Sequence, residues 1–124
     1  DQQGVSIGVS ERSAYDLWLS DNFKSAKIVR APSIQASHAL FWDNKVDVLA
    51  SLKPKLIEEI DNREGVRLIE KPFTAVKQSI GLPKGSQNSV AYINQVIRSS
   101  IQEGWLLDRL NYHGMASRLG IPLY

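Results

Sequence analysis

The stretch V-S-I-G-V-S-E-R-S-A-Y-D-L-W-L, residues 5–19, decides the expected fold because its apolar period changes half way along. Apolar residues occupy alternate positions from 5 to 9, which indicates a strand that ends at Ser10. From about residue 13 to residue 19, apolar residues follow helical spacing instead. A strand that leads directly into a helix is typical of a strand–helix–strand unit.

The same alternation of short strands and helices continues as far as residue 69. Further strands are expected at residues 26–29, 46–50 and 66–69. Helices are expected to begin near Ser33 and near Pro54. Asn44 ends the first of these in the left-handed conformation, and residues 62–65 end the second. The pattern predicts an α/β fold with a mostly parallel sheet of four or five strands flanked by helices.

After Pro72 the sequence pattern changes. Residues 73–82 form a longer extended run that the turn at residues 83–85 closes. Helices without an intervening strand are expected at about residues 89–102 and 105–112. The chain therefore divides into an α/β domain at residues 1–72, an extended segment and turn at 73–85, and C-terminal helices at 86–124.

Length and composition restrict the class of protein. The 124 residues suit one domain, and no apolar run approaches the ~20 residues that span a bilayer, so we expect no membrane-spanning helix. A net charge of +2 is too small to indicate a nucleic-acid partner. The chain has no cysteine and two histidines, so we expect neither a metal site nor a cofactor. It begins at Asp1 rather than Met, and we expect a processed product or an excised piece.

The first candidate binding site is the turn between the first strand and the first helix. A helix N-terminus favours an anion, Ser10 or Ser13 offers a hydroxyl, and Arg12 offers a guanidinium for a carboxylate or phosphate. The simpler interpretation, which we favour, is that a serine caps the helix and that Arg12 is solvated.

The second candidate site is the turn after the third strand. Ser51, Leu52 and Lys53 follow that strand, and the carboxyl ends of parallel strands face one crevice. The simpler interpretation is again favoured, with Ser51 as a helix cap and Lys53 as a surface charge.

We expect no enzyme, because the sequence shows no catalytic group of residues. The dinucleotide, P-loop and nucleophile-elbow motifs are all absent. His38 and His113 have no partner at ligand spacing. Glu58-Glu59 lies beside Lys55 and indicates a solvated helix face.

Short motifs along the whole chain resemble those of one family. They lie at residues 4–9 with 13–16, 44–49, 79–85, 102–105 and 112–114. In this order they resemble the bacterial extracellular solute-binding proteins of the amino-acid type (family 3), which are receptors for ABC importers. The resemblance covers the second half of such a protein. It implies a type II periplasmic-binding-protein lobe, a hinge-like return strand, and helices that would pack on the missing lobe one.

The resemblance also implies a function and a set of site residues. A small polar solute such as an amino acid would bind between two lobes, with the membrane subunits of an importer as partners, in the periplasm or outside the cell. Ser13 keeps a hydroxyl of the family, Ala14 replaces a second one, and Arg12 stands at a glycine position. Leu52 stands where the family has an acidic residue for the ligand's ammonium group, so the identity of the ligand stays open. The implied site comprises Ser10, Arg12, Ser13, Ala14, Tyr15, Ser51, Leu52 and Lys53.

An alternative is an interaction or assembly module without high-affinity ligand binding. The helix at residues 89–102 has Ile93, Ile97 and Ile101 on one face, and Trp105 follows it. In a truncated receptor this apolar face has no lobe to cover it, and such faces are commonly buried by a partner. A symmetric dimer that swaps its C-terminal helices would cover it.

Overall fold

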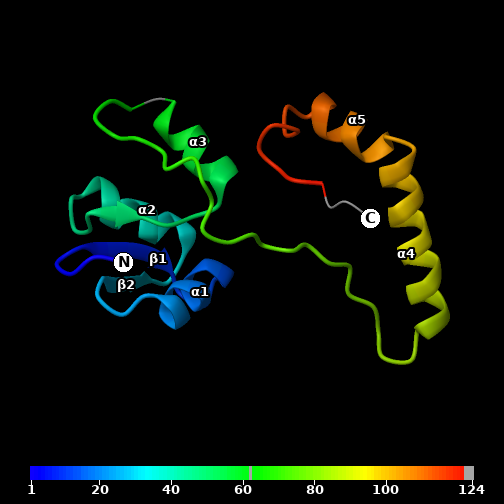
Figure 1. Ribbon diagram of the computed structural model, residues 1–124, viewed down its shortest axis with the longest axis horizontal. Coiled ribbons are helices and arrows are strands. Elements are labelled where there is room, and N and C mark those ends of the chain that lie inside the picture. The colour runs from blue at the N-terminus through cyan, green and yellow to red at the C-terminus, as the bar shows by residue number, and fades with distance from the viewer. Residues whose placement is uncertain (62, 122–124) are drawn as a thin grey trace. The chain divides into compact units, whose positions relative to one another are not determined.

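A computed structural model describes residues 1–61 and 63–121 of the chain. Its elements in chain order are β1 (Ser6–Ser10), α1 (Ala14–Asn22), β2 (Lys27–Ala31), α2 (Ile34–Trp42), β3 (Val48–Leu49), α3 (Lys53–Ile60), α4 (Gln87–Gln102) and α5 (Trp105–Tyr112) (Figure 1). They fall into two compact units, unit 1 (Asp1–Lys77) and unit 2 (Gln78–Tyr124). Asn62, expected at the end of the third helix, and residues 122–124 of the expected C-terminal part lie outside the described residues.

Unit 1 is built on a parallel sheet of three strands in the order β2-β1-β3. The register places Gly8 of β1 between Val29 of β2 and Leu49 of β3. Paired residues of neighbouring strands point to the same face, so each face of the sheet combines side chains from all three strands. The expected α/β fold with a parallel sheet is confirmed.

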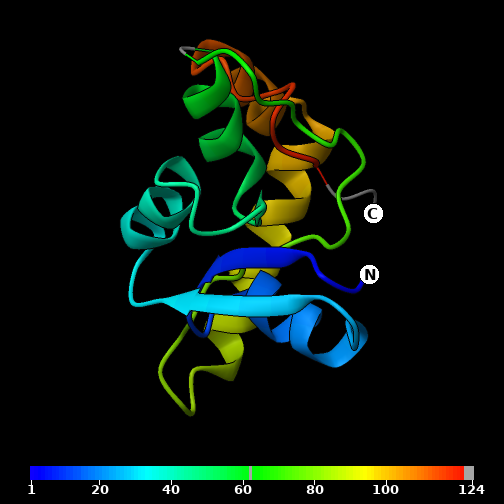
Figure 2. The same cartoon turned by 90° about the vertical axis from the view of Figure 1, so that its left-hand side faces the viewer.

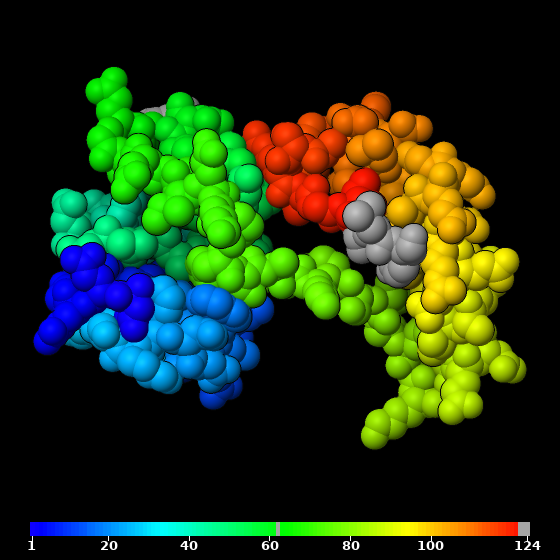
Figure 3. Space-filling model, in the orientation of Figure 1, coloured from blue at the N-terminus to red at the C-terminus, as the bar shows by residue number. Residues whose placement is uncertain are grey.

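One face of this sheet forms the hydrophobic core with α1. The buried cluster consists of Ile7, Val9, Tyr15, Leu19 and Ala50. Trp18 and Phe23 pack against it with their ring centroids 6.1 Å apart. Figure 3 shows the outer surface of this unit in blue to green. The core therefore lies between β1 and α1, and it holds the carboxyl end of β1 in place.

The other face of the sheet carries α2, so α1 and α2 lie on opposite sides of the strands (Figure 2). Gly8 permits this close packing. A Cβ at Gly8 would lie 3.0 Å from Val46 Cγ2 and 3.6 Å from the carbonyl oxygen of Ser37. The distance to Ser37 of α2 is an ordinary contact, whereas the distance to Val46 is too short, so an added methyl group would displace the buried side chain of Val46 between α2 and β3.

The expected fourth strand at residues 66–69 is wrong, since no strand is found there. Its apolar residues do alternate in burial, with Val66 and Leu68 half-buried and Arg67 exposed. Alternating burial shows that one face of the segment is half-buried, but a segment becomes a strand only if it also pairs with a free edge of the sheet. The edge strand β3 is two residues long and presents few backbone groups for pairing.

The extended run at residues 73–82, expected as a return strand, also forms no strand. Its side chains are exposed except for Thr74, and Ile80 is 60% exposed. An extended segment without a partner strand leaves its backbone N–H and C=O groups bonded to water. Nothing in the described chain therefore stabilises a strand at residues 73–82. The expected sheet of four or five strands is therefore corrected to three.

The predicted left-handed end of α2 at Asn44 is confirmed. Asn44 has φ 56°, its N–H donates to the Phe41 carbonyl at 3.0 Å, and the Lys45 N–H donates to the Leu40 carbonyl at 2.8 Å. This pair of bonds is a Schellman motif, which satisfies carbonyls that a helix end leaves free. It turns the chain back toward β3.

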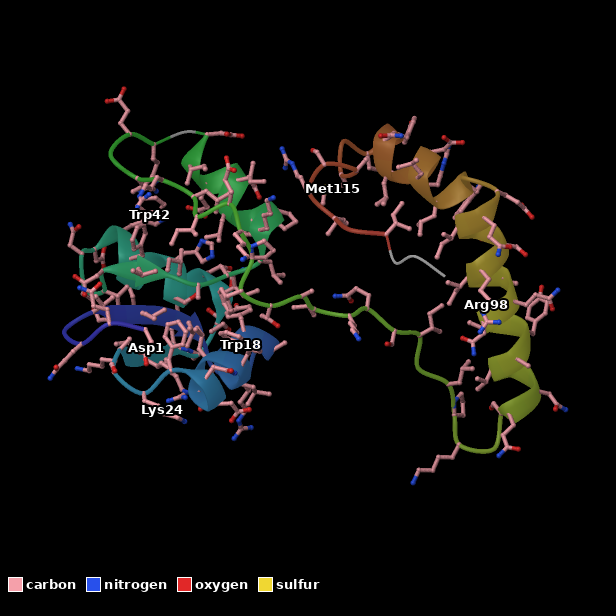
Figure 4. All side chains as sticks on the ribbon, in the orientation of Figure 1. Asp1, Trp18, Lys24, Trp42, Arg98 and Met115 are labelled. Atoms are coloured by element: carbon pink, nitrogen blue, oxygen red, sulfur yellow. The ribbon has the colours of Figure 1, made fainter. Side chains whose placement is uncertain are left out.

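Asp1 anchors the start of unit 1 to the loop before β2. Its carboxylate accepts hydrogen bonds from the N–H groups of Lys24, Ser25 and Ala26 at 2.8 to 3.1 Å. Figure 4 labels Asp1 and Lys24 close together in unit 1.

Unit 2 contains α4 and α5, which pack on each other. Ile97 and Ile101 of α4 are half-buried, as is Leu106 of α5, and neither helix has a fully buried residue. Gly104 joins the two helices with φ 78°. Among the described residues, no helix is both long and apolar enough to cross a bilayer.

Candidate functional site

The carboxyl ends of β1 and β3 form the candidate site. In the order β2-β1-β3, the chain leaves β1 toward one side and reaches β3 on the other, so β1 and β3 flank a topological switch point. The Ala50 N–H donates to the Gly8 carbonyl at 3.0 Å, and continuing this register places Ser51 beside Ser10. The two turns that the sequence singled out therefore begin at adjacent strand ends.

Arg12 lies in the turn after β1 with a left-handed backbone, φ 59°. Glycine adopts this conformation at the lowest cost. The Arg12 N–H donates to Asp16 Oδ2 at 2.9 Å, while its side chain is exposed. The guanidinium is thus presented to solvent at the edge of the switch point.

Ser13 is the N-cap of α1, as its simpler interpretation predicted. Its hydroxyl accepts a hydrogen bond from the Asp16 N–H at 3.1 Å. A hydroxyl in this role satisfies a free helix donor and is less available to a ligand.

Asp16 is an organising residue that the sequence reasoning missed. It is 3% exposed, and besides the Arg12 N–H it binds Arg30 Nε at 3.0 Å, while Arg30 Nη2 donates to Ser20 Oγ at 2.7 Å. The spacing Ser13-x-x-Asp16 is that of a capping box, and this signal was available in the sequence. Asp16 joins the turn, α1 and β2.

The other two residues predicted for the first turn, Ala14 and Tyr15, lie in different surroundings. Ala14 is exposed at the start of α1. Tyr15 is 4% exposed and belongs to the core, with a buried hydroxyl that has no hydrogen-bond partner among the described residues. The ring of Tyr15 therefore packs in the core beside the turn and does not line the surface of the site.

Ser51 meets His38, an interaction that sequence spacing did not reveal. His38 Nε2 lies 3.0 Å from Ser51 Oγ. His38 belongs to α2 and is 4% exposed, whereas Ser51 is half-buried at the end of β3. Burial keeps the imidazole in one position against the hydroxyl.

Glu59 of α3 lies on the other side of the His38 ring. Its Oε1 is 3.3 Å from His38 Nδ1, without the alignment of a hydrogen bond, and its Oε2 accepts from Trp42 Nε1 at 2.8 Å. Trp42 lies between α2 and α3 (Figure 4), and the guanidinium of Arg63 stands 4.1 Å from its ring centroid. Desolvation acts to raise the pKa of Glu59, but the hydrogen bond from Trp42 and the contact with His38 outweigh it and lower the pKa. The carboxylate is ionised at neutral pH.

No protein-family model matches the chain, and neither does any curated protein or solved structure. The site is therefore interpreted from its own chemistry.

Leu52 and Lys53 complete the second turn. Leu52 is the N-cap of α3, is 41% exposed and makes no side-chain cap. Lys53 is the first residue of α3 and is exposed. Each turn thus presents one solvated cation, Arg12 or Lys53, beside a serine hydroxyl.

The arrangement offers hydroxyl groups, helix N-termini and cations. In the part of the chain that the structure describes, no three metal-binding side chains form a cluster. Hydroxyls, free N–H groups and cations recognise carboxylates and phosphates, so the site is suited to a small anionic group.

Proposed function

We propose that the chain binds a small polar solute with an anionic group at the carboxyl ends of β1 and β3. The observation that carries this proposal is the parallel order β2-β1-β3, which brings the turns at Arg12 and Lys53 to one switch point. Open α/β sheets bind their ligands at such a point. The proposed function consists of binding and releasing the solute and includes no chemical reaction.

The setting of this function follows from the family resemblance and is part of the proposal. The chain would be the second lobe of a type II solute receptor for an ABC importer, located in the periplasm or outside the cell. The left-handed backbone of Arg12, at a glycine position of the family, supports it. With Leu52 in place of the family's acid, the ligand's anionic group rather than an ammonium group is the feature recognised.

Calorimetric titration of the full chain with amino acids, small dicarboxylates and inorganic phosphate tests the proposal. We expect one of these ligands to bind, and Arg12→Ala to weaken its binding by about tenfold or more, which corresponds to ~1.4 kcal/mol. Arg67→Ala removes an exposed cation far along the chain from both turns and is the matched control. Equal affinities for all three proteins, or no binding by the wild-type chain, would refute the assignment.

A second candidate function is an assembly module, favoured by the exposure of apolar side chains in unit 2. Val90, Val96, Trp105 and Leu107 are each at least 42% exposed. Surfaces of this kind are commonly covered by a partner, here a second copy of the chain. Light scattering over a concentration series tests it. A dimer that Trp105→Ser dissociates supports this function, and a monomer at all concentrations contradicts it.

A further inference from the structure

Side chains from three separate parts of unit 1 bring a hydroxyl, an imidazole and a carboxylate together. Ser51 lies two residues after the end of β3, His38 lies on α2 and Glu59 lies on α3. Ser51 Oγ is 3.0 Å from His38 Nε2, and Glu59 Oε1 is 3.3 Å from His38 Nδ1. The hydroxyl and the carboxylate thus lie next to different nitrogens of one imidazole ring. This arrangement activates a serine nucleophile.

We infer that Ser51 is the nucleophile of an acyl-transfer site for small carboxylic esters, with His38 as its base and Glu59 as the group that orients His38. This activity goes beyond the proposed binding function: it shares Ser51 with the binding site and adds His38 and Glu59, which the binding function does not use.

The carboxylate determines which tautomer the imidazole adopts. An ionised Glu59 beside Nδ1 favours the proton on Nδ1, which leaves the lone pair of Nε2 directed at the Ser51 hydroxyl. The contact at Nδ1 is long and poorly aligned, and contacts of this kind tighten in many enzymes when substrate binds. Trp42 restrains the other carboxylate oxygen at 2.8 Å and limits the positions that Glu59 can take.

The start of α3 supplies donors for the negative charge that forms during acyl transfer. The N–H groups of Leu52 and Lys53 directly follow Ser51, and neither donates to a backbone carbonyl within the described residues. Pro54, the next residue, has no N–H group. In nucleophile-elbow enzymes the N–H after the serine stabilises the oxyanion, and the Leu52 N–H occupies that place in the sequence.

The backbone at Ser51 differs from such an elbow in one respect. The positive-φ residues other than glycine are Arg12 and Asn44 among those described, so the serine itself is not held in a strained turn. Its hydroxyl is instead directed by the buried imidazole.

The reaction balances without a cofactor. The hydroxyl proton of Ser51 moves to His38 Nε2 as Oγ bonds to the ester carbonyl carbon. The C–O bond to the alcohol then breaks, and Nε2 returns the proton to the departing oxygen. Water next gives a proton to Nε2 and attacks the acyl group, and Ser51 recovers its proton as the acid leaves. Ester and water thus become acid and alcohol.

A fluorophosphonate probe tests this inference directly on the full chain. We expect one probe per molecule, attached to Ser51, as located by mass spectrometry of peptides from the wild-type protein. Attachment to any other residue, or no labelling, refutes the proposal, and this measurement requires no variant to fold.

Variants then assign the roles. Ser51→Ala abolishes labelling, and His38→Gln slows it by about 100-fold or more, the usual contribution of a general base. Glu59→Gln keeps an acceptor for Trp42 but removes the charge, and it should slow labelling and shift its pH profile. The matched control is Ser25→Ala, which removes an exposed hydroxyl and should leave the rate unchanged. A Glu59→Gln protein with the wild-type rate and pH profile would remove Glu59 from the site.

Hydrolysis of p-nitrophenyl acetate tests whether the site turns over. We expect the wild-type protein to hydrolyse this ester and Ser51→Ala to lose the activity. No hydrolysis by the wild-type protein would contradict turnover.

Discussion

At the scale of single residues, backbone conformation matters most at Arg12. Its φ of 59° lies in the region that side chains with a Cβ occupy at a cost of roughly 1–2 kcal/mol. The hydrogen bond from its N–H to Asp16, whose side chain is 3% exposed, holds the turn in this conformation. The turn that exposes the Arg12 guanidinium is therefore strained and supported from within α1.

Comparison of Arg12→Gly with Arg12→Ala isolates this strain. Both variants lose the guanidinium, and alanine retains the Cβ that the left-handed region disfavours. We expect the glycine variant to have a free energy of unfolding higher by about 1 kcal/mol, measured by urea denaturation. Equal stabilities would show that the turn relaxes out of the left-handed region.

Asp47 is the second residue whose local chemistry has a measurable consequence. The Ser6 hydroxyl donates to Asp47 Oδ2 at 2.5 Å and the Ser6 N–H donates to it at 2.8 Å. These bonds lower the pKa of Asp47 below its ordinary value of 3.8, and the bond from the Ser6 hydroxyl contributes most. The bonds stabilise the charged form and tie the start of β1 to the segment that precedes β3.

This pKa shift predicts a loss of stability in acid. A depressed pKa in the folded state contributes stability above pH 3.8, and that contribution is lost as the pH falls below this value. Asp47→Asn should therefore flatten the decline in the free energy of unfolding between about pH 5 and pH 2, followed by urea denaturation. Asp21→Asn changes an exposed carboxyl at the end of α1 and should keep the wild-type slope. The same slope in both variants would contradict the role of Asp47.

At the scale of elements, the helices of unit 1 begin in different ways. Ser13 and Ser33 cap α1 and α2 by accepting from the N–H groups of Asp16 and Ala36, each at 3.1 Å. The N-cap of α3 is Leu52, whose side chain offers no acceptor. The helix that carries Glu59 is therefore the least well capped of the three.

Leu52→Ser should stabilise the protein. The Lys55 N–H at the third helical position donates to the Leu52 carbonyl at 3.0 Å, and the new hydroxyl can accept from the same N–H, which is worth about 0.5 kcal/mol net. Because Leu52 is already 41% exposed, its removal exposes little additional apolar surface. Thermal and urea denaturation measure the gain. Ser33→Ala is the reciprocal control and should lose about 1 kcal/mol, whereas a less stable Leu52→Ser would contradict this account of α3.

At the scale of the whole molecule, the two units differ in how much side-chain burial supports them. Among the described residues, the buried hydrophobic side chains all belong to unit 1, namely Ile7, Val9, Tyr15, Leu19, Ala31, Val46 and Ala50. The helices of unit 2 have none, and an isolated pair of helices without a core is marginal in water.

Hydrogen exchange followed by mass spectrometry should separate the two units. Amides of β1 and α2 should exchange slowly, through global unfolding of unit 1, whereas amides of α4 and α5 should exchange within seconds to minutes through local opening. If α4 exchanges as slowly as β1, a partner or a second copy covers unit 2, which the light-scattering experiment would then identify.

Much of the fold was predictable because it depends on neighbours in sequence. The strand that ends at Ser10, the cap at Ser13 and the left-handed Asn44 follow from apolar periodicity and from local hydrogen bonds. Such features depend on residues within about one helical turn of each other. The sequence indicated the two turns at the switch point for the same reason.

The strand at residues 66–69 and the partners of His38 show where local patterns stop being sufficient. Alternating burial is present at residues 66–69, but pairing depends on a free edge contributed by another element. His38 lies 13 positions from Ser51 and 21 from Glu59, at no spacing that a motif would reveal.

The sequence by itself determined the order of the elements as far as α3, the left-handed end of α2 and the parallel α/β class, because these depend on periodicity and capping within a few residues. The tertiary structure alone decided that three strands pair rather than four or five, and that Ser51, His38 and Glu59 meet at one strand end. Those outcomes depend on how α2 and α3 pack on the sheet, and that packing is set by the shapes of surfaces contributed by distant parts of the chain.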